Sequence, residues 1–257
     1  MNIYPLISCL CVSSNRPGHL TNAINYFLAQ TYPNKELIII SSRQDLEYME
    51  ITAPYEKSNV RYYGLQSGEG LTLGELRNIS LERAAGEYFC VWDDDDWYHC
   101  RRLEIEMQEV IKSGKKGVVL AYCILYDKLS GEAGLSLPTT FLPSMLCQKS
   151  IISPDLLYPA MNKMEDAVFA TRLFRMNVII PLINPVLYIY VHHGNNTWNR
   201  EHFMGHYAQK LSEKTTEIIA EAVSGKISCE RGSEMLSHPD LLSELNYMIS
   251  FEWEEVK

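Results

Sequence analysis

Short apolar runs recur along the first half of the chain and have the length of buried strands. They lie at Leu6–Val12, Glu36–Ile40, Val60–Tyr63, Tyr88–Trp92 and Val118–Tyr122. Their residues are apolar almost without interruption, which is typical of strands covered on both faces rather than on one. We therefore expect these five segments to form one sheet with both of its faces buried.

Apolar residues at helical spacing separate these runs. Leu20, Ile24, Phe27 and Leu28 predict one helix, Gly70–Ala85 a second that ends at Gly86, and Leu103–Ile111 a third that ends at Gly114. Strands that alternate with helices of this length predict an α/β fold with a single Rossmann-like, mostly parallel central sheet and helices on both faces. Ligands of such sheets bind beyond the carboxyl ends of the strands.

The pattern changes after residue 125. Gly131, Gly134, Pro138 and Pro143 predict loops or a hairpin. Beyond them we expect a helix at Glu165–Met176 and a strand at Leu187–Val191 that leads into His192–Trp198. The chain from about residue 201 is expected to be helical with mixed charge.

Composition excludes several classes of protein. The 257 residues are 46% hydrophobic, and 23 Lys and Arg against 32 Asp and Glu give a net charge of -9. This negative net charge argues against sequence-independent binding to nucleic acid. The seven cysteines lack metal-site or disulfide spacing, and no segment approaches the roughly 18 apolar residues of a membrane span. We therefore expect a reducing, cytoplasmic protein.

Four consecutive carboxylates, Asp93–Asp96, follow the strand predicted at Tyr88–Trp92. Two like charges about 4 Å apart repel by about 4 kcal/mol at an effective dielectric constant near 20. A divalent cation removes this repulsion, and Asp93 and Asp95 share one face if strand geometry continues. The alternative is a solvated acidic turn or a helix N-terminus. The flanking Trp92 and Trp97 favour the metal site.

Six short motifs follow one another in a fixed order. They are Ile7–Pro17 with its N-R-P turn, Gln30–Ile40, Arg77-Asn78 with Ala85–Tyr88, Asp93–Asp96, Glu165-Asp166, and His193–Thr197. Together they resemble the inverting family 2 glycosyltransferases, which have the A-type nucleotide-sugar-binding fold. The resemblance covers residues 5 to about 200.

This resemblance implies catalytic and metal-binding roles. Asp95 and Asp93 would bind Mn²⁺ or Mg²⁺, with Asp93 acting through water or on the ribose, and His193 would complete the coordination or contact the diphosphate. Asp166 would be the general base that takes the proton of the acceptor hydroxyl, and Glu165 would either assist it or only support the local geometry. Without the resemblance, the preferred interpretation of Glu165-Asp166 is a pair of carboxylates that stabilises the first turn of a helix.

The resemblance also implies a nucleotide-sugar site and a UDP-linked donor. Its residues would be Ser13, Ser14, Asn15, Arg16, Ser41, Ser42, Arg77, Asp93 and Asp94. Ser41 and Ser42 depart from the family pattern, because relatives carry an aspartate pair there that contacts the nucleobase. A serine hydroxyl accepts from a base N–H without charge assistance. Asp45 is a candidate substitute, and Ser14 stands where relatives often have a stacking aromatic residue.

We thus expect a metal-dependent inverting glycosyltransferase whose acceptor is a saccharide or lipid-linked saccharide. Residues 1–200 would form the transferase domain, with a nucleotide-binding half at 1–100 and an acceptor-binding half at 101–200. Thr139, Thr140 and Met145 are candidates for the acceptor pocket. Residues 201–257 would form a helical extension, a candidate for peripheral contact with the inner face of the membrane.

Two other functions compete with this one. The first is a non-catalytic binding or assembly module of the same fold, and the intact acidic and histidine motifs argue against it. The second is a metal-dependent nucleotidyltransferase, which needs a basic residue in a glycine-rich first loop. Only Arg16 is available for that role.

Overall fold

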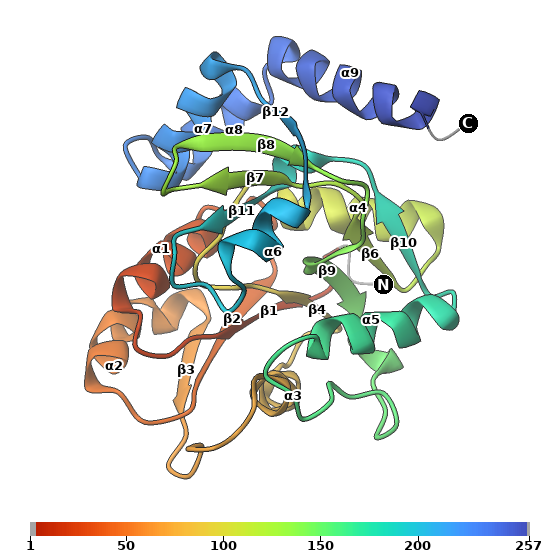
Figure 1. The fold of residues 1–257 in the computed structure, drawn as a ribbon. Coiled ribbons are helices and arrows are strands. Elements are labelled where there is room, and N and C mark those ends of the chain that lie inside the picture. The colour runs from red at the N-terminus through yellow and green to blue at the C-terminus, as the bar shows by residue number, and fades with distance from the viewer. Residues whose placement is uncertain (1–3, 256–257) are drawn as a thin grey trace.

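A seven-stranded sheet and a smaller five-stranded sheet form the framework of the computed structural model, which describes residues 4–255 (Figure 1). The large sheet has the order β10 (Ile179–Leu182), β6 (Gly117–Leu120), β9 (Phe141–Gln148), β4 (Tyr88–Val91), β1 (Ile7–Val12), β2 (Lys35–Ser41) and β3 (Val60–Gly64). The small sheet has the order β12 (Tyr207–Lys210), β8 (Glu132–Ser136), β7 (Ile124–Asp127), β11 (Tyr188–His192) and β5 (Trp97–Tyr98).

Nine α-helices and three short 3-10 helices cover these sheets in the described part of the chain. The α-helices are α1 (Pro17–Leu28), α2 (Leu46–Thr52), α3 (Leu73–Arg83), α4 (Arg102–Ser113), α5 (Glu165–Arg175), α6 (Arg200–Gly205), α7 (Glu213–Ser224), α8 (Cys229–Leu236) and α9 (Pro239–Glu255). The 3-10 helices are η1 (Ala53–Ser58), η2 (Lys149–Ile151) and η3 (Pro185–Leu187).

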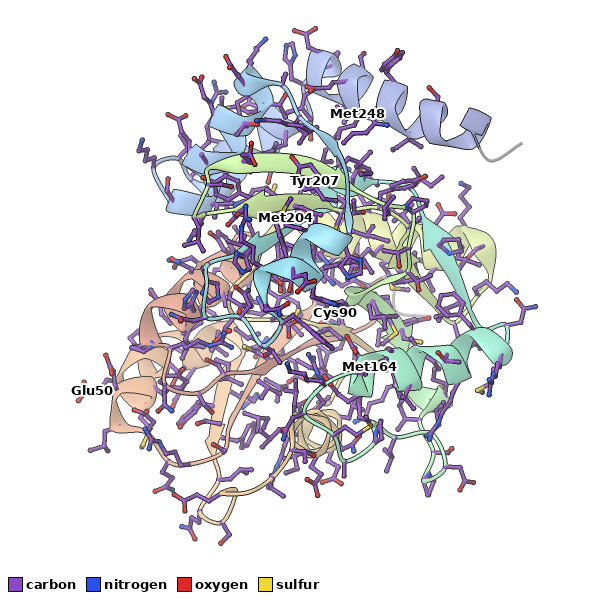
Figure 2. All side chains as sticks on the ribbon, in the orientation of Figure 1. Glu50, Cys90, Met164, Met204, Tyr207 and Met248 are labelled. Atoms are coloured by element: carbon purple, nitrogen blue, oxygen red, sulfur yellow. The ribbon has the colours of Figure 1, made fainter. Side chains whose placement is uncertain are left out.

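Both faces of the large sheet are buried, as the unbroken apolar runs predict. Cys9 and Cys11 of β1 join the core that includes α1, α4 and the small sheet, whereas Leu10 points to the opposite core under α3 and α5. Strand β2 divides its residues between the two cores in the same way, and Cys90 of β4 lies in the interior (Figure 2). The mostly parallel sheet with helices on both faces is confirmed.

Strand β9 lies in the middle of the large sheet and is antiparallel to both neighbours, β4 and β6. The sequence predicted only loops or a hairpin here, and the β7–β8 hairpin accounts for part of that region. Pro143 and an irregularity in the pairing hide β9 from the pattern. Ser144 compensates, since its side-chain oxygen accepts the Leu120 amide at 2.8 Å.

Helix ends follow local capping chemistry. Helix α3 is shorter than the predicted Gly70–Ala85, because Thr72 and Glu75 form a capping box that starts it and Ala84 is extended. Helix α4 ends at Gly114 as predicted, with a φ of 68° that favours glycine. Ile111, placed on the apolar face of that helix by its spacing, is instead exposed.

The chain after residue 200 contains the expected helices and one strand that the sequence did not predict. Helices α7, α8 and α9 lie beside the small sheet, and α9 is the last element (Figure 1). Strand β12 pairs with β8 and so builds this segment into the small sheet. Within residues 4–255, every helix is too short or too polar to cross a bilayer.

A buried arginine of α4 contacts both sheets and forms an ion pair within its own helix. Arg102 and Glu106 of α4 are 0% and 1% exposed and lie 3.0 Å apart. The guanidinium also donates to the Val91 carbonyl at 3.3 Å. Its carbon lies 4.9 to 5.5 Å from the ring centres of three aromatic residues, Trp92, Tyr98 and Tyr188. This arginine therefore anchors the strand end that precedes the acidic run.

We expect Glu106→Ala to lower the free energy of unfolding by about 3–5 kcal/mol, because it leaves Arg102 buried without a counter-charge. Urea unfolding followed by circular dichroism measures this. Replacing both residues, Arg102→Met with Glu106→Leu, is expected to recover much of the loss. A loss below about 1 kcal/mol for the single variant would show that the pair is dispensable.

Candidate active site

The candidate site lies at the carboxyl ends of β1, β2 and β4, where the fold predicts a ligand site. These strands are parallel, so the segments that follow them meet at one edge of the sheet. Beside this edge is a cleft of about 440 Å³. Its walls include Arg16, Arg77, Asp93, Asp95 and Asp166, all of which the sequence singled out.

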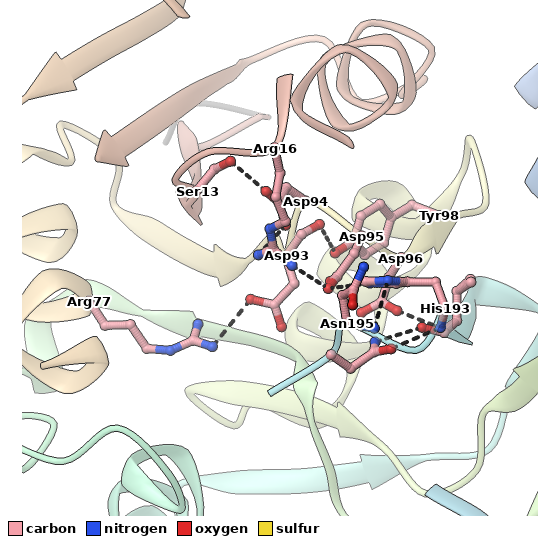
Figure 3. Close-up of polar contacts among 12 residues, drawn as sticks. Ser13, Arg16, Arg77, Asp93, Asp94, Asp95, Asp96, Tyr98, His193 and Asn195 are labelled. Carbon is pink, nitrogen blue, oxygen red and sulfur yellow. Dashed lines mark hydrogen bonds and ion pairs between the residues drawn. The ribbon is translucent and has the colours of Figure 1, made fainter. Parts of the chain in front are cut away.

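Strand geometry does not continue into the acidic run. Strand β4 ends at Val91, and Asp94 and Asp95 lie in a turn. Asp93 and Asp95 still both line the cleft, whereas Asp94 does not and is 1% exposed. Figure 3 shows the contacts of these side chains. The four carboxylates therefore have different surroundings.

Arg16 neutralises the middle of the run. Its two terminal nitrogens lie 2.7 Å from Asp94 and 2.7 Å from Asp95. Ser13 also donates its hydroxyl to Asp94. Burial raises the pKa of Asp94 to about 7, with a further rise from the charge of Asp95, although Arg16 and Ser13 act in the opposite direction.

His193 contacts the same oxygen of Asp95 as Arg16, with Nε2 at a distance of 3.2 Å. Burial alone raises the pKa of Asp95, but the hydrogen bond from His193 and the charge of Arg16 outweigh it, so the net pKa is lowered. The ring of His19, on α1, lies 4.7 Å from that of His193. Asn196 fixes the His193 loop by accepting the His193 amide at 2.8 Å.

Arg77 joins the acidic run to the Glu165-Asp166 pair. It lies 3.2 Å from Asp93 and 3.2 Å from Glu165, and it is 8% exposed (Figure 3). Glu165 is thus held as an ion-pair partner in the first turn of α5. Asp166, the next residue, lines the cleft and accepts only the Ala167 amide at 2.7 Å among the described residues. Its second carboxylate oxygen is free for a ligand.

Asp96 is buried and hydrogen-bonded to β11. It accepts the Val191 amide at 2.8 Å and the Tyr188 hydroxyl, both from β11. Burial raises the pKa of Asp96 well above its ordinary value, with the neighbouring carboxylates adding to the rise. This carboxylate ties the acidic run to the strand that precedes His193.

The predicted base-reading residues lie together beside the cleft. Ser14 and Ser41 have their hydroxyl oxygens 3.3 Å apart, at the ends of neighbouring strands. Ser42 lies next to them, and its amide is 3.5 Å from the Ser14 hydroxyl. Asn15 accepts from Arg43. Asp45, the candidate substitute for the aspartate pair, caps α2 by accepting the Glu47 amide at 3.0 Å.

The donor groups of the predicted metal site suit a hard divalent cation, because they are carboxylate oxygens and one imidazole nitrogen. Only Asp95 and His193 are in contact, however, while Asp93 faces Arg77. Among the side chains that the structure describes, residues 4–250, no three His, Cys, Asp or Glu side chains converge on one point as metal ligands do. Arg16 and His193 contact the same oxygen of Asp95, so a cation bound to that oxygen would have to share it with the guanidinium.

Several cleft residues were missed from the sequence. They are Lys163, Trp198, His202 and His206, which line the cleft with the predicted Thr139 and Thr140. The H-x-x-x-H spacing of His202 and His206 was the available signal, since residues four apart share a helix face. Met145, predicted for the acceptor pocket, is instead 2% exposed within the core under α3 and α5.

Comparison with known proteins gives a consistent result. The sequence profile described as glycosyl transferase family 2 matches residues 8–178. A putative teichuronic acid biosynthesis glycosyltransferase, TuaG of Bacillus subtilis, is 29% identical over 107 residues, which are 42% of each chain. An uncharacterized glycosyltransferase of Rickettsia prowazekii is 24% identical over 182 residues, 65% of this chain and 56% of that one. The chain thus spans about half or less of these curated relatives' length.

Solved structures show the same fold. TarS 1-349 of S. aureus in complex with UDP-GlcNAc superimposes with a TM-score of 0.63 at 14% identity, over 94% of this chain and 79% of that one. The mannosyltransferase PcManGT of Pyrobaculum calidifontis, in complex with GDP-Man and Mn²⁺, gives 0.59 at 11% identity, over 97% and 75%. At these identities the likeness concerns the fold alone.

We expect Arg77→Met to lower the free energy of unfolding by about 3–5 kcal/mol, because it leaves Asp93 and Glu165 without their shared cation. Chemical denaturation provides the measurement. Arg231→Met is the matched control, since Arg231 and its partner Glu234 are 56% and 70% exposed, and such surface pairs contribute about 1 kcal/mol or less. Equal losses in the two variants would contradict the structural role of Arg77.

Proposed function

This chain belongs to glycosyl transferase family 2, and on that premise we propose that it transfers a sugar, with inversion, from a nucleoside-diphosphate sugar to an acceptor hydroxyl. One observation carries the proposal. Asp93, Asp95 and Asp166 all line a single cleft. A donor held at the acidic run would thus present its sugar toward a carboxylate that has a free oxygen.

Asp166 is proposed as the general base. In the reaction, the acceptor oxygen forms a bond to the anomeric carbon, while the bond from that carbon to the diphosphate oxygen breaks. The acceptor proton goes to Asp166, and the nucleoside diphosphate leaves with the electron pair of the broken bond. Glu165 acts on Asp166 only indirectly, because its charge is taken up by Arg77 at 3.2 Å.

The donor is proposed to lie over the ends of β1, β2 and β4, within residues 1–100. Its base would reach Ser14, Ser41 and Ser42, and its ribose would approach Asp93. UDP is the proposed nucleotide, supported by the fold shared with TarS, whose structures hold UDP-GlcNAc and UDP. Serine hydroxyls can donate and accept hydrogen bonds with the base, but they lack the negative charge that an aspartate would supply.

Mn²⁺ or Mg²⁺ is the proposed cofactor. Asp95, Asp93 and His193 offer suitable donor atoms, and the PcManGT complex with Mn²⁺ supports a metal in this fold. Bound there, the ion would stabilise the negative charge that grows on the departing diphosphate. Arg77 would hold Asp93 in place, and both Arg77 and Arg16 would face the diphosphate.

The acceptor is proposed to be a saccharide or lipid-linked saccharide that enters from residues 101–200. Thr139 and Thr140 lie on the wall of the cleft with Asp166. Peripheral membrane contact through the helices of residues 201–257 is also part of this proposal, although β12 ties this segment to the small sheet.

We expect Asp166→Asn to reduce transfer by about 10²- to 10⁴-fold, the contribution of a positioned general base. Sugar transfer, or donor hydrolysis in the absence of acceptor, measures the loss. The variant should still show a metal-dependent rise in melting temperature with UDP, because it keeps the donor site.

The matched control is Asp155→Asn, an exposed aspartate in the connection before α5 and outside the cleft. It should transfer at the wild-type rate. If neither UDP, GDP, CDP nor dTDP raises the melting temperature of the wild-type protein with Mn²⁺, the transferase proposal fails.

We expect Arg16→Gln to strengthen binding of Mn²⁺ to the nucleotide-free protein by roughly tenfold, since the guanidinium competes with the ion for Asp95. Electron paramagnetic resonance of free Mn²⁺ gives the affinity without an activity assay. Arg43→Gln is the control, because Arg43 is exposed and pairs with Asn15 instead. Weaker Mn²⁺ binding in Arg16→Gln would mean that Arg16 supports the ligands rather than competing with the ion.

A further inference from the structure

Four cleft residues outside the acidic run form what we call the Lys163 cluster. Its members are Lys163, Trp198, His202 and His206. We propose that the Lys163 cluster binds an anionic group of the acceptor, a phosphate or a carboxylate carried by its sugar. This inference rests on the proposed transferase function and adds the chemical class of the acceptor.

Lys163 supplies the charge. Its ammonium lies 4.7 Å from the centre of the Trp198 ring, which holds it across the cleft by a cation–π contact. Arg16 and Arg77, the other cations of the cleft, are each paired with two carboxylates. Among the described residues, Lys163 forms no such ion pair, so its charge is free for a ligand.

The aromatic part of the cluster is ordered by its own contacts. Trp198 stacks on His202, with ring centres 4.1 Å apart and planes inclined by 19°. His202 and His206 lie one turn apart on the chain, with their Nε2 atoms 3.2 Å apart. One ring therefore donates to the other, and the accepting ring carries its proton on Nδ1.

That Nδ1–H has no acceptor within the described part of the chain. Burial lowers the pKa of His206, and the neighbouring His202 lowers it further. The pair thus offers a hydrogen-bond donor in the same cleft as the Lys163 ammonium. A cation and a directed N–H are the two contacts that recognise a phosphate or carboxylate oxygen.

The position of Lys163 near the proposed base in the sequence indicates that the anionic group it binds belongs to the acceptor and not to the donor. Lys163 precedes Asp166 by three residues, and both line the cleft. An acceptor whose hydroxyl meets Asp166 therefore brings its other substituents close to the ammonium. The lining residues Thr139, Thr140 and Asn162 are neutral, and the lining carboxylates of Asp93 and Glu165 are paired with Arg77, which reduces their repulsion of an anion.

Isothermal titration tests this on the full chain saturated with UDP and Mn²⁺. The probes are glucose 6-phosphate, glucuronate and glucose, which differ in the anionic group. We expect one or both anionic sugars to bind at least fivefold more tightly than glucose, the effect of about one partly screened ion pair. The stronger of the two identifies phosphate or carboxylate as the preferred group.

Lys163→Gln should remove this preference, and Lys163→Arg should retain most of it. Lys115→Gln is the matched control, because Lys115 contacts Asn177 and neither residue lines the cleft. Equal affinities for all three sugars, or the same preference in Lys163→Gln as in the wild type, would overturn the inference.

The nucleotide response separates this inference from the function on which it rests. If UDP with Mn²⁺ raises the melting temperature of Lys163→Gln as in the wild type, the donor site is intact and any lost affinity belongs to the acceptor side. If Lys163→Gln instead loses the response to UDP, Lys163 serves the donor and the inference is wrong. A wild-type protein without any nucleotide response refutes the transferase proposal itself.

Discussion

The mutual repulsion of four adjacent carboxylates is the constraint around which the site is built. Each member of the acidic run finds a partner from another part of the chain: Arg77 of α3 for Asp93, Arg16 after β1 for Asp94 and Asp95, and β11 for Asp96. Neutralising the run therefore brings three distant segments together at one sheet edge. The loop that carries His193 and the helix that carries Asp166 are positioned through the same contacts, by Asp96 and by Arg77.

The parts of the fold that could be predicted from the sequence are the strands buried on both faces. Strands β1, β2 and β4 lie between two cores, so nearly every residue is apolar and the run is easily read. Strand β9 escaped because Pro143 and Ser144 interrupt its apolar pattern, although tertiary pairing with β4 and β6 supports it. Strand β12 is only partly buried, so composition gives it no strand signal. Local pattern cannot report these pairings, because the paired residues lie 21 to 76 positions apart in the chain.

The candidate site was predictable as a set of residues but not as a set of contacts. Motif order identified the acidic run, the Glu165-Asp166 pair and His193. Most of these residues line one cleft, and His193 contacts Asp95, which lines it. Four identical aspartates nevertheless have different partners, because the turn after β4 decides where each side chain points. Trp198 and His202 were missed since their proximity to Lys163 depends on how two loops meet.

The placement of β9 also has a consequence for biosynthesis. Strands β4 and β6 are both synthesised before β9, yet they are joined only through it. A nascent chain that ends before Phe141 therefore carries β4 with one open edge, and open edges invite pairing with other chains. The charges of Asp93–Asp96 stand at the end of that exposed strand and repel a second copy of it. The residues that serve the mature cleft would thus first act as gatekeepers against aggregation while the protein is still being made.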